Sequence, residues 1–173
     1  MTKSFKAVFI DRDGTIGGSG DIVYPKDFEV YKFTLEAIKL LKEFGFKVFG
    51  FSNQPGISSG NSSEEEFYKQ LISFGLDDAY ICPHTDEMNC ECRKPKAGML
   101  YRASKEYNLD LKKCIVIGDS WRDMLAAHNG GVKKILVKTG NGKDDFDLLR
   151  LKFSNVNIDY YAENLLDAVK WII

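Results

Sequence analysis

The sequence predicts an α/β fold, with one doubly wound parallel sheet between two layers of helices. The first observation is that short runs rich in Val, Ile and Phe alternate along the chain with segments in which apolar residues recur at helical spacing. The second is that these runs are apolar throughout, as strands are when helices cover both faces of a sheet. Because 44% of the 173 residues are hydrophobic, the chain can bury one substantial core, and we expect a single domain over residues 1–173.

Five runs are predicted to form the strands of this sheet. They are a first run that ends at Asp11, followed by Lys47–Ser52, Asp78–Cys82, Cys114–Gly118 and Lys134–Val137. Each is short, contains β-branched or aromatic residues, and is bounded by polar or glycine-containing segments. Since a helical pattern separates successive strands, the connections between parallel strands should be right-handed crossovers.

The first two predicted helices have clear boundaries. In Thr34–Phe44 the residues Ala37, Leu41 and Phe44 lie on one face, and Gly45 ends the pattern. The segment Ser63–Phe74 opens with Ser63 and Glu66 at the spacing of a capping box, and its buried face should carry Phe67, Leu71 and Phe74.

Three later segments are also predicted to be helical. They are marked by Leu100, Ala103 and Tyr107, by the run Met124–Asn129 before Gly130-Gly131, and by Leu165, Val169 and Ile172. The segment Gly140–Asn157 mixes glycine, acidic residues and leucine without a clear period. No element is therefore predicted there.

Two acidic residues stand one position apart where the first strand ends. Asp11 is expected at the last position of the strand, and Asp13 in the turn that Gly14 permits. Mg²⁺ prefers oxygen ligands and retains several waters, so one or two carboxylates and the oxygens of a phosphate can hold it. The pair favours a site for a divalent cation and a phosphate, although taken alone it fits an ordinary Asp-Gly turn equally well.

Two further strands also end in polar groups. Ser52 is followed by Asn53 and Gln54, and the run Cys114–Gly118 is followed by D-S-W-R-D. In a parallel α/β sheet, ligands bind outside the carboxyl ends of the strands, where the strand order reverses. Three strand ends that carry Asp, Ser and Asn therefore predict one site at that edge of the sheet.

The charge balance argues against several classes of partner. The formal net charge is −1 and no block of Lys and Arg occurs, so nothing favours binding to nucleic acid or to a membrane surface. No apolar segment approaches the roughly 20 residues that span a bilayer, and the N-terminus has no stretch of the length of a signal peptide. We therefore expect a cytoplasmic monomer that acts on a small molecule.

Three of the four cysteines and one of the two histidines lie within eleven positions, as Cys82, His84, Cys90 and Cys92. This Cys₃His set is common in structural Zn²⁺ sites, which order a loop without taking part in chemistry. A disulfide is disfavoured in a chain without a secretion signal, and Cys90 and Cys92 are too close for an unstrained one. Reduced cysteines without a metal are the remaining alternative.

Taken together, the motifs resemble those of one superfamily. They are D-x-D-G-T from Asp11, Ser52 at a strand end, Lys94 before Pro95, and G-D-S-W-R-D from Gly118. Over nearly the whole chain this pattern resembles the haloacid dehalogenase (HAD) superfamily of phosphotransferases. The resemblance implies a Rossmann-like HAD fold and Mg²⁺-dependent hydrolysis of a phosphate ester through an aspartyl-phosphate intermediate.

The resemblance also implies catalytic roles for the aspartates. Asp11 would be the nucleophile, and Asp13 the general acid that protonates the leaving oxygen and then activates water. Asp119 would complete the Mg²⁺ site with Asp11 and the backbone carbonyl of Asp13. Asp123 would orient the phosphate-binding lysine or the metal ligands, unless it only caps the helix that begins after Ser120.

Other matching residues would contact the phosphate or the rest of the substrate. Ser52 and Lys94 would hold the phosphoryl oxygens, with Lys96 as the alternative lysine and an ordinary turn as the alternative role of Ser52. The candidate substrate-binding residues are Arg12, Asn53, Gln54, Arg93 and Lys94.

The Cys/His cluster runs directly into R-K-P-K at Arg93, and this arrangement resembles one zinc-bearing branch of the superfamily. That branch contains the D-glycero-D-manno-heptose 1,7-bisphosphate phosphatases and the histidinol-phosphate phosphatases, and S-N-Q-P-G-I, G-M-L and K-T-G resemble the heptose group more. The segment Ile16–Tyr24, with its glycine-rich part Gly17–Gly20, lacks the asparagine of that group. The short spacing between motifs leaves no room for a large cap domain, so the site should be open.

Two other functions remain as alternatives. A phospho-acceptor signalling domain also combines clustered aspartates with a lysine on a doubly wound sheet, but it needs neither Asp13 nor a zinc loop. A zinc-organised binding domain would use the Cys/His cluster for a partner and would tolerate the loss of Asp11. The D-x-D-G-T run favours the phosphatase over both.

Overall fold

The computed structural model describes residues 6–173, and the first five residues lie outside this part of the chain. Its strands are β1 (Ala7–Ile10), β2 (Lys47–Asn53), β3 (Asp78–Cys82), β4 (Cys114–Gly118), β5 (Lys133–Val137) and β6 (Tyr160–Ala162). Its α-helices are α1 (Thr34–Glu43), α2 (Glu64–Ser73), α3 (Gly98–Tyr107), α4 (Trp121–Asn129), α5 (Gly142–Lys152) and α6 (Leu165–Ile172). None of the helices described is long and apolar enough to cross a bilayer.

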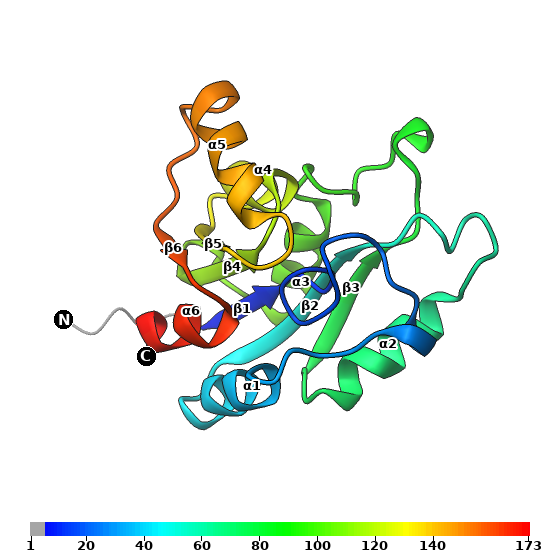
Figure 1. Cartoon of the computed structure of the whole chain (residues 1–173), viewed down its shortest axis with the longest axis horizontal. Coiled ribbons are helices and arrows are strands. Elements are labelled where there is room, and N and C mark those ends of the chain that lie inside the picture. The colour runs from blue at the N-terminus through cyan, green and yellow to red at the C-terminus, as the bar shows by residue number, and fades with distance from the viewer. Residues whose placement is uncertain (1–5) are drawn as a thin grey trace.

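The strands form one sheet in the order β3-β2-β1-β4-β5-β6, and every neighbouring pair is parallel (Figure 1). The chain builds the sheet outward in one direction from β1 and then in the other direction from β4. The strand order therefore reverses between β1 and β4, which makes the sheet doubly wound. This confirms the fold predicted from the sequence and places the ends of β1 and β4 where such sheets bind ligands.

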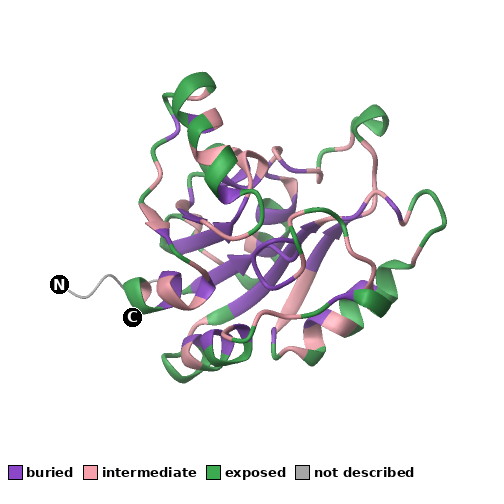
Figure 2. Ribbon diagram, viewed as in Figure 1, coloured by how far each residue is buried: buried purple, intermediate pink, exposed green. Residues whose placement is uncertain are grey.

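Helices cover both faces of the sheet, with α1, α2 and α6 on one side and α3, α4 and α5 on the other (Figure 1). Alternate residues of β1 point to opposite faces. Val8 and Ile10 belong to the core shared with α1 and α6, whereas Ala7 and Phe9 belong to the core shared with α3 and α4. Figure 2 shows the resulting burial of the central strands, which explains why they are apolar throughout.

One α-helix and one strand of the described residues were not predicted. The helix α5 lies in the segment whose sequence has no clear period. Only Gly142 and Leu149 among its residues are buried, which explains why the period is missing. The strand β6 has only three residues, Tyr160–Ala162, and lies at the edge of the sheet. Phe44 was expected on one helix face with Ala37 and Leu41, but α1 ends at Glu43 and Phe44 is 58% exposed.

Candidate active site

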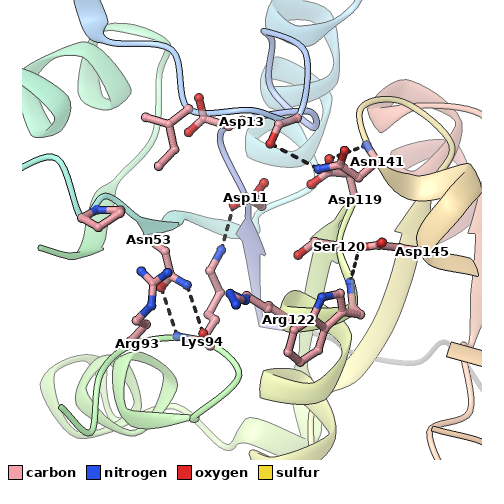
Figure 3. Close-up of a pocket in the computed structure, with 14 residues that line it drawn as sticks. Asp11, Asp13, Asn53, Arg93, Lys94, Asp119, Ser120, Arg122, Asn141 and Asp145 are labelled. Atoms are coloured by element: carbon pink, nitrogen blue, oxygen red, sulfur yellow. Dashed lines mark hydrogen bonds and ion pairs between the residues drawn. The ribbon is translucent and has the colours of Figure 1, made fainter. Parts of the chain in front are cut away.

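A cavity of about 320 Å³ opens at the carboxyl edge of the sheet (Figure 3). Its walls come from the segments that follow β1, β2, β4 and β5 and from the loop that carries the cysteines. The residues that line it are Asp11, Asp13, Gly20, Ile22, Asn53, Pro55, Arg93, Lys94, Asp119, Ser120, Trp121, Arg122, Asn141 and Asp145. The edge at which the sequence predicts a site therefore carries a cavity rich in charged groups.

Lys94 connects two carboxylates at this cavity. Its Nζ donates hydrogen bonds of 2.7 Å each to Asp11 Oδ1, to Asp123 Oδ1 and to the carbonyl oxygen of Phe51. Burial alone would lower the pKa of Lys94, but the two carboxylates raise it above its usual value, so the lysine is charged. Lys96 does not line the cavity and pairs with an exposed glutamate instead, which favours Lys94 as the phosphate-binding lysine.

Asp11 is the first residue after β1 rather than its last, and Asp119 follows β4. The Oδ2 atom of Asp119 accepts a hydrogen bond from the backbone N–H of Asn141 at 2.8 Å. Asp119 is packed so closely that a Cβ atom on Gly14 or Gly140 would lie 2.0 or 2.1 Å from its Oδ2. Both glycines also have positive φ, at +93° and +56°, so the turns after β1 and β5 depend on glycine to admit this carboxylate.

Three buried carboxylates can converge on one cation. Asp11, Asp119 and Asp123 each offer an oxygen within 4.8 Å of the other two. Burial and the charge of Asp123 raise the pKa of Asp11 to about 7, against the opposing effect of Lys94. Burial and the charge of Asp11 raise the pKa of Asp119 to about 9. A single lysine does not balance three such groups, and the oxygen donor set fits Mg²⁺.

Asp123 makes both of the contacts considered for it. One carboxylate oxygen accepts from Lys94, while Oδ2 accepts from the backbone N–H of Ser120 at 3.1 Å and from its hydroxyl at 2.9 Å. The Ser120 hydroxyl in turn accepts from the backbone N–H of Asp123 at 3.3 Å, which completes a capping box at the start of α4. The helix cap therefore fixes the carboxylate that orients Lys94.

The side chain of Asp13 lines the cavity but turns away from the carboxylate cluster. Its Oδ1 accepts from Arg12 Nη1 at 2.8 Å and from the backbone N–H of Val23 at 3.0 Å. Its Oδ2 accepts from Gln54 Nε2 at 2.6 Å. The structure thus separates the carboxyl group of Asp13 from the group that could hold a metal, which suits a role in proton transfer.

Three of the predicted contact residues do not line the cavity. Arg12 and Gln54 are fully buried, and Ser52 is 1% exposed, with its hydroxyl accepting from Gln54 Nε2 at 2.8 Å. The physical reason is that Arg12 lies in the turn after β1, where its guanidinium group packs between Phe28 and Phe67 while Asp11 and Asp13 face the cavity. Direct contact of Arg12 or Gln54 with a substrate is therefore not supported, and both lie beneath Asp13 instead.

Asn53 and Arg93, two of the candidate substrate-binding residues, do line the cavity. The side-chain amide of Asn53 accepts from the backbone N–H of Lys94 at 3.0 Å and donates to its carbonyl at 3.1 Å, so it fixes the loop that carries the lysine. Arg93 Nε donates to Asp86 Oδ1 at 2.8 Å, and its Nη1 donates to the carbonyl of His84 at 3.1 Å. The guanidinium group is thereby held at the rim by the loop of the cysteines.

The four residues of the Cys/His cluster converge as predicted. The three sulfur atoms of Cys82, Cys90 and Cys92 lie 3.2–3.6 Å apart, and His84 Nδ1 lies 3.5 Å from Cys82 Sγ and 3.2 Å from Cys92 Sγ. These separations are close to the edge of about 3.8 Å of a tetrahedron with Zn–S bonds of about 2.3 Å. All three cysteines are free thiols, and the donor set fits structural Zn²⁺.

Several lining residues were not predicted from the sequence, among them Trp121, Arg122, Asn141 and Asp145. Asn141 donates through Nδ2 to the carbonyl of Gly20 at 3.2 Å, and Asp145 Oδ2 accepts from the backbone N–H of Trp121 at 2.8 Å. Asn141 follows β5, so the rule that ligands bind at the carboxyl ends of strands could have found it. Asp145 lies in α5, whose presence was not predicted.

Comparisons with known proteins agree with this geometry. A family model described as HAD-hydrolase-like matches residues 91–168. A D-glycero-beta-D-manno-heptose-1,7-bisphosphate 7-phosphatase of Helicobacter pylori (strain J99) is 38% identical, and the alignment covers 99% of each chain. A D-glycero-alpha-D-manno-heptose-1,7-bisphosphate 7-phosphatase of Campylobacter jejuni is 39% identical and covers 91% of this chain and 96% of its own.

A solved structure is similar over the same length. The D,D-heptose 1,7-bisphosphate phosphatase from B. bronchiseptica, complexed with magnesium and phosphate, matches with a TM-score of 0.81 and 27% identity, and the match covers 96% of this chain and 97% of that one. The enzyme is therefore a phosphoric monoester hydrolase of the type that uses Mg²⁺. The chain belongs to the HAD superfamily of phosphatases, in the family that contains the heptose 1,7-bisphosphate 7-phosphatases.

Proposed function

We propose that this enzyme removes the 7-phosphate of D-glycero-D-manno-heptose 1,7-bisphosphate by way of an aspartyl phosphate on Asp11. The observation that carries the proposal is the convergence of Asp11, Asp119 and Lys94 at the position where the strand order reverses. The names of the H. pylori and C. jejuni relatives support the choice of substrate. A phosphatase domain spanning residues 1–173 is part of the proposal.

Asp11 acts as the nucleophile in this proposal. Mg²⁺ held by Asp11, Asp119 and the backbone carbonyl of Asp13 would neutralise the negative charge of the phosphoryl group. Lys94 supplies a positive charge beside Asp11, which a carboxylate needs in order to approach an anionic phosphate. Asp123 keeps the lysine in place, and its link to the cap of α4 makes that position rigid.

Asp13 acts as the general acid and then as the general base. Protonation of the leaving oxygen is needed because a sugar alkoxide is a poor leaving group, and the same carboxylate then activates water against the aspartyl phosphate. The separation of the Asp13 side chain from Asp119 and Asp123 supports this division of labour. Ser52 lies one residue before the end of β2, and its hydroxyl would have to turn from Gln54 toward the cavity in order to bind a phosphoryl oxygen, as its family motif implies.

The loop of the cysteines positions the substrate. Zn²⁺ bound by Cys82, His84, Cys90 and Cys92 would order this long loop before the substrate arrives, which lowers the entropy cost of binding. The loop presents Arg93 at the cavity, where its planar fork can bind an anionic or hydroxyl-rich part of the substrate. The cavity is small and half of its lining residues are charged, which favours a phosphorylated sugar over an aromatic or lipid phosphate.

A panel of phosphorylated metabolites tests the proposal. It contains both anomers of heptose 1,7-bisphosphate, because relatives are named for each. It also contains histidinol phosphate, the substrate of the other zinc-bearing group, together with hexose phosphates and phenyl phosphate. We expect the largest kcat/KM for one heptose bisphosphate anomer, with Mg²⁺ required. A preference for histidinol phosphate would show that this compound, and not the heptose bisphosphate, is the substrate. A stable aspartyl phosphate without turnover would indicate a phospho-acceptor domain.

A further inference from the structure

Arg12 is the largest fully buried side chain in the part of the chain that the structure describes. Its guanidinium carbon lies 3.7 Å from the centre of the Phe28 ring and 4.8 Å from that of Phe67. A charged group that is removed from water requires partners that satisfy its hydrogen bonds. The position of those partners indicates what the residue does.

Each edge of the guanidinium group of Arg12 has its own partners. Nη1 donates to Asp13 Oδ1 at 2.8 Å and to the carbonyl of Val23 at 2.7 Å. Nε and Nη2 donate to Gln70 Oε1 at 3.2 and 2.7 Å. Gln70 belongs to α2 and donates through Nε2 to the carbonyl of Pro25 at 2.9 Å. A planar group with a fixed geometry therefore connects Asp13 to α2.

Val23 links Arg12 and Asp13 to the wall of the cavity. Its N–H donates to Asp13 Oδ1 at 3.0 Å, while its carbonyl accepts from Arg12. The preceding residues Gly20 and Ile22 line the cavity. Arg12 and the backbone of Val23 thus hold the Asp13 carboxyl group, and the same hydrogen bonds fix this part of the cavity wall.

We infer that Arg12 is a positioning residue, which fixes the Asp13 carboxyl group and the segment 20–23 relative to a phosphoryl group at Asp11. Arg12 touches no substrate, because it does not line the cavity. Its effect is on proton transfer to the leaving oxygen. The inference rests on the proposed function, in which Asp13 is the general acid.

The test compares two substrates of similar shape that differ in their need for a proton. The p-nitrophenolate group leaves p-nitrophenyl phosphate without protonation, whereas the alkoxide of benzyl phosphate must be protonated as it leaves. The parameter is kcat/KM, because it reports the steps up to transfer of the phosphoryl group to the enzyme. A loss of folded protein lowers it equally for both substrates.

Three variants carry the test. In Arg12→Lys the charge remains but the fork that reaches Asp13 and Gln70 together is lost. Gln70→Met removes the acceptor of Arg12 Nε and Nη2 and leaves the hydrogen bond between Arg12 and Asp13 in place. Lys69→Met is the matched control, since Lys69 precedes Gln70 on α2 and its side chain is 73% exposed.

We expect Arg12→Lys to lower kcat/KM for benzyl phosphate by about 100-fold and for p-nitrophenyl phosphate by less than about threefold, within the range of general acid catalysis. Gln70→Met should show the same selectivity at about tenfold, and Lys69→Met no change. Equal losses for both substrates in folded Arg12→Lys and Gln70→Met would overturn the inference. If Arg12→Lys does not fold, Gln70→Met decides.

The variant Asp13→Asn separates the inference from the proposal on which it rests. Selective loss of benzyl phosphate hydrolysis in Asp13→Asn, without such selectivity in the Arg12 and Gln70 variants, would overturn only the role of Arg12. Equal losses for both substrates in Asp13→Asn would instead contradict the assignment of Asp13 as the general acid.

Discussion

Lys94 Nζ lies 2.7 Å from Asp11 Oδ1, although the two residues are 83 positions apart in the sequence. Asn53 fixes the backbone of Lys94 through two hydrogen bonds, and Lys94 directly follows the loop with the cysteines. The nucleophile proposed here therefore meets its neutralising charge only when β1, β2 and this loop are assembled together. The position of the lysine is a property of the tertiary structure.

Replacing the two basic residues of this loop should have different kinetic effects. Lys94→Ala should lower kcat by about 100- to 1,000-fold, because a charge beside the transferring phosphoryl group acts mainly in the transition state. Arg93→Ala should mainly raise KM, because Arg93 lies at the rim and binds the substrate before and during the reaction. Steady-state kinetics with the best substrate check this. Equal effects of both substitutions on kcat would refute the division.

The affinity for Mg²⁺ should depend on pH. In the metal-free protein the pKa of Asp11 is raised to about 7 and that of Asp119 to about 9, so Mg²⁺ must displace protons at neutral pH. The apparent affinity should therefore fall as the pH is lowered from 9 to 6, by up to about tenfold per unit for each proton displaced. Calorimetric titration in buffers of different ionisation enthalpy measures the protons released. A pH-independent affinity would contradict this.

The same pKa shifts predict how the stability of the metal-free protein depends on pH. The pKa values of Asp11 and Asp119 are higher in the folded state than in the unfolded chain, so the folded state binds more protons between about pH 4 and 9. The free energy of unfolding should therefore decrease as the pH rises through this window, and saturating Mg²⁺ should remove most of the decrease. Urea denaturation at several pH values, with and without Mg²⁺, measures both effects.

Zinc should be present at about one ion per chain and should be separable from Mg²⁺. Cys90→Ser should lose the zinc and lower the thermal stability, because the loop then orders without its metal. Cys114→Ala is the matched control, since Cys114 lies in β4 outside the cluster and should leave the zinc content unchanged. Elemental analysis of reduced protein measures the content. Full zinc content in Cys90→Ser would exclude the assignment.

Gly140→Ala should weaken Mg²⁺ binding. The new Cβ would lie 2.1 Å from Asp119 Oδ2, so the carboxylate must move, and such changes next to a metal ligand cost about 10- to 100-fold in affinity. Gly131→Ala is the control, because Gly131 also has positive φ but no atom within 4 Å of the added Cβ. The control should lose stability without losing Mg²⁺ affinity. An equal loss of affinity in both variants would show that backbone strain, rather than Asp119, is responsible.

The parts of the fold that were predicted correctly depend on local patterns. The capping box of Ser63 and Glu66 is present at the start of α2, and the apolar runs became strands because helices bury both of their faces. In contrast, α5 buries Leu149 but Phe146 only in part, and it leaves Leu151 84% exposed, so its apolar stripe is too short and too mixed to predict a helix.

Residues of the candidate site could be predicted where their position follows from the order of the strands. The carboxyl ends of β1, β2 and β4 meet at one edge, and this places Asp11, Asn53 and Asp119 together. The side chains of Arg12 and Gln54 could not be placed in this way, because both residues lie in irregular segments after their strands and the partners of Arg12 lie in other parts of the chain.

The most direct test of the account is the release of phosphate from heptose 1,7-bisphosphate by the wild-type enzyme and by Asp11→Asn, at saturating Mg²⁺. The wild-type enzyme should release one phosphate per substrate molecule. The variant should be slower on the order of 10⁴-fold or more while retaining its circular dichroism spectrum, because an amide oxygen neither attacks phosphorus effectively nor balances the charge of the metal. Phosphate release by Asp11→Asn at a rate near that of the wild type would contradict the central claim that Asp11 is the nucleophile.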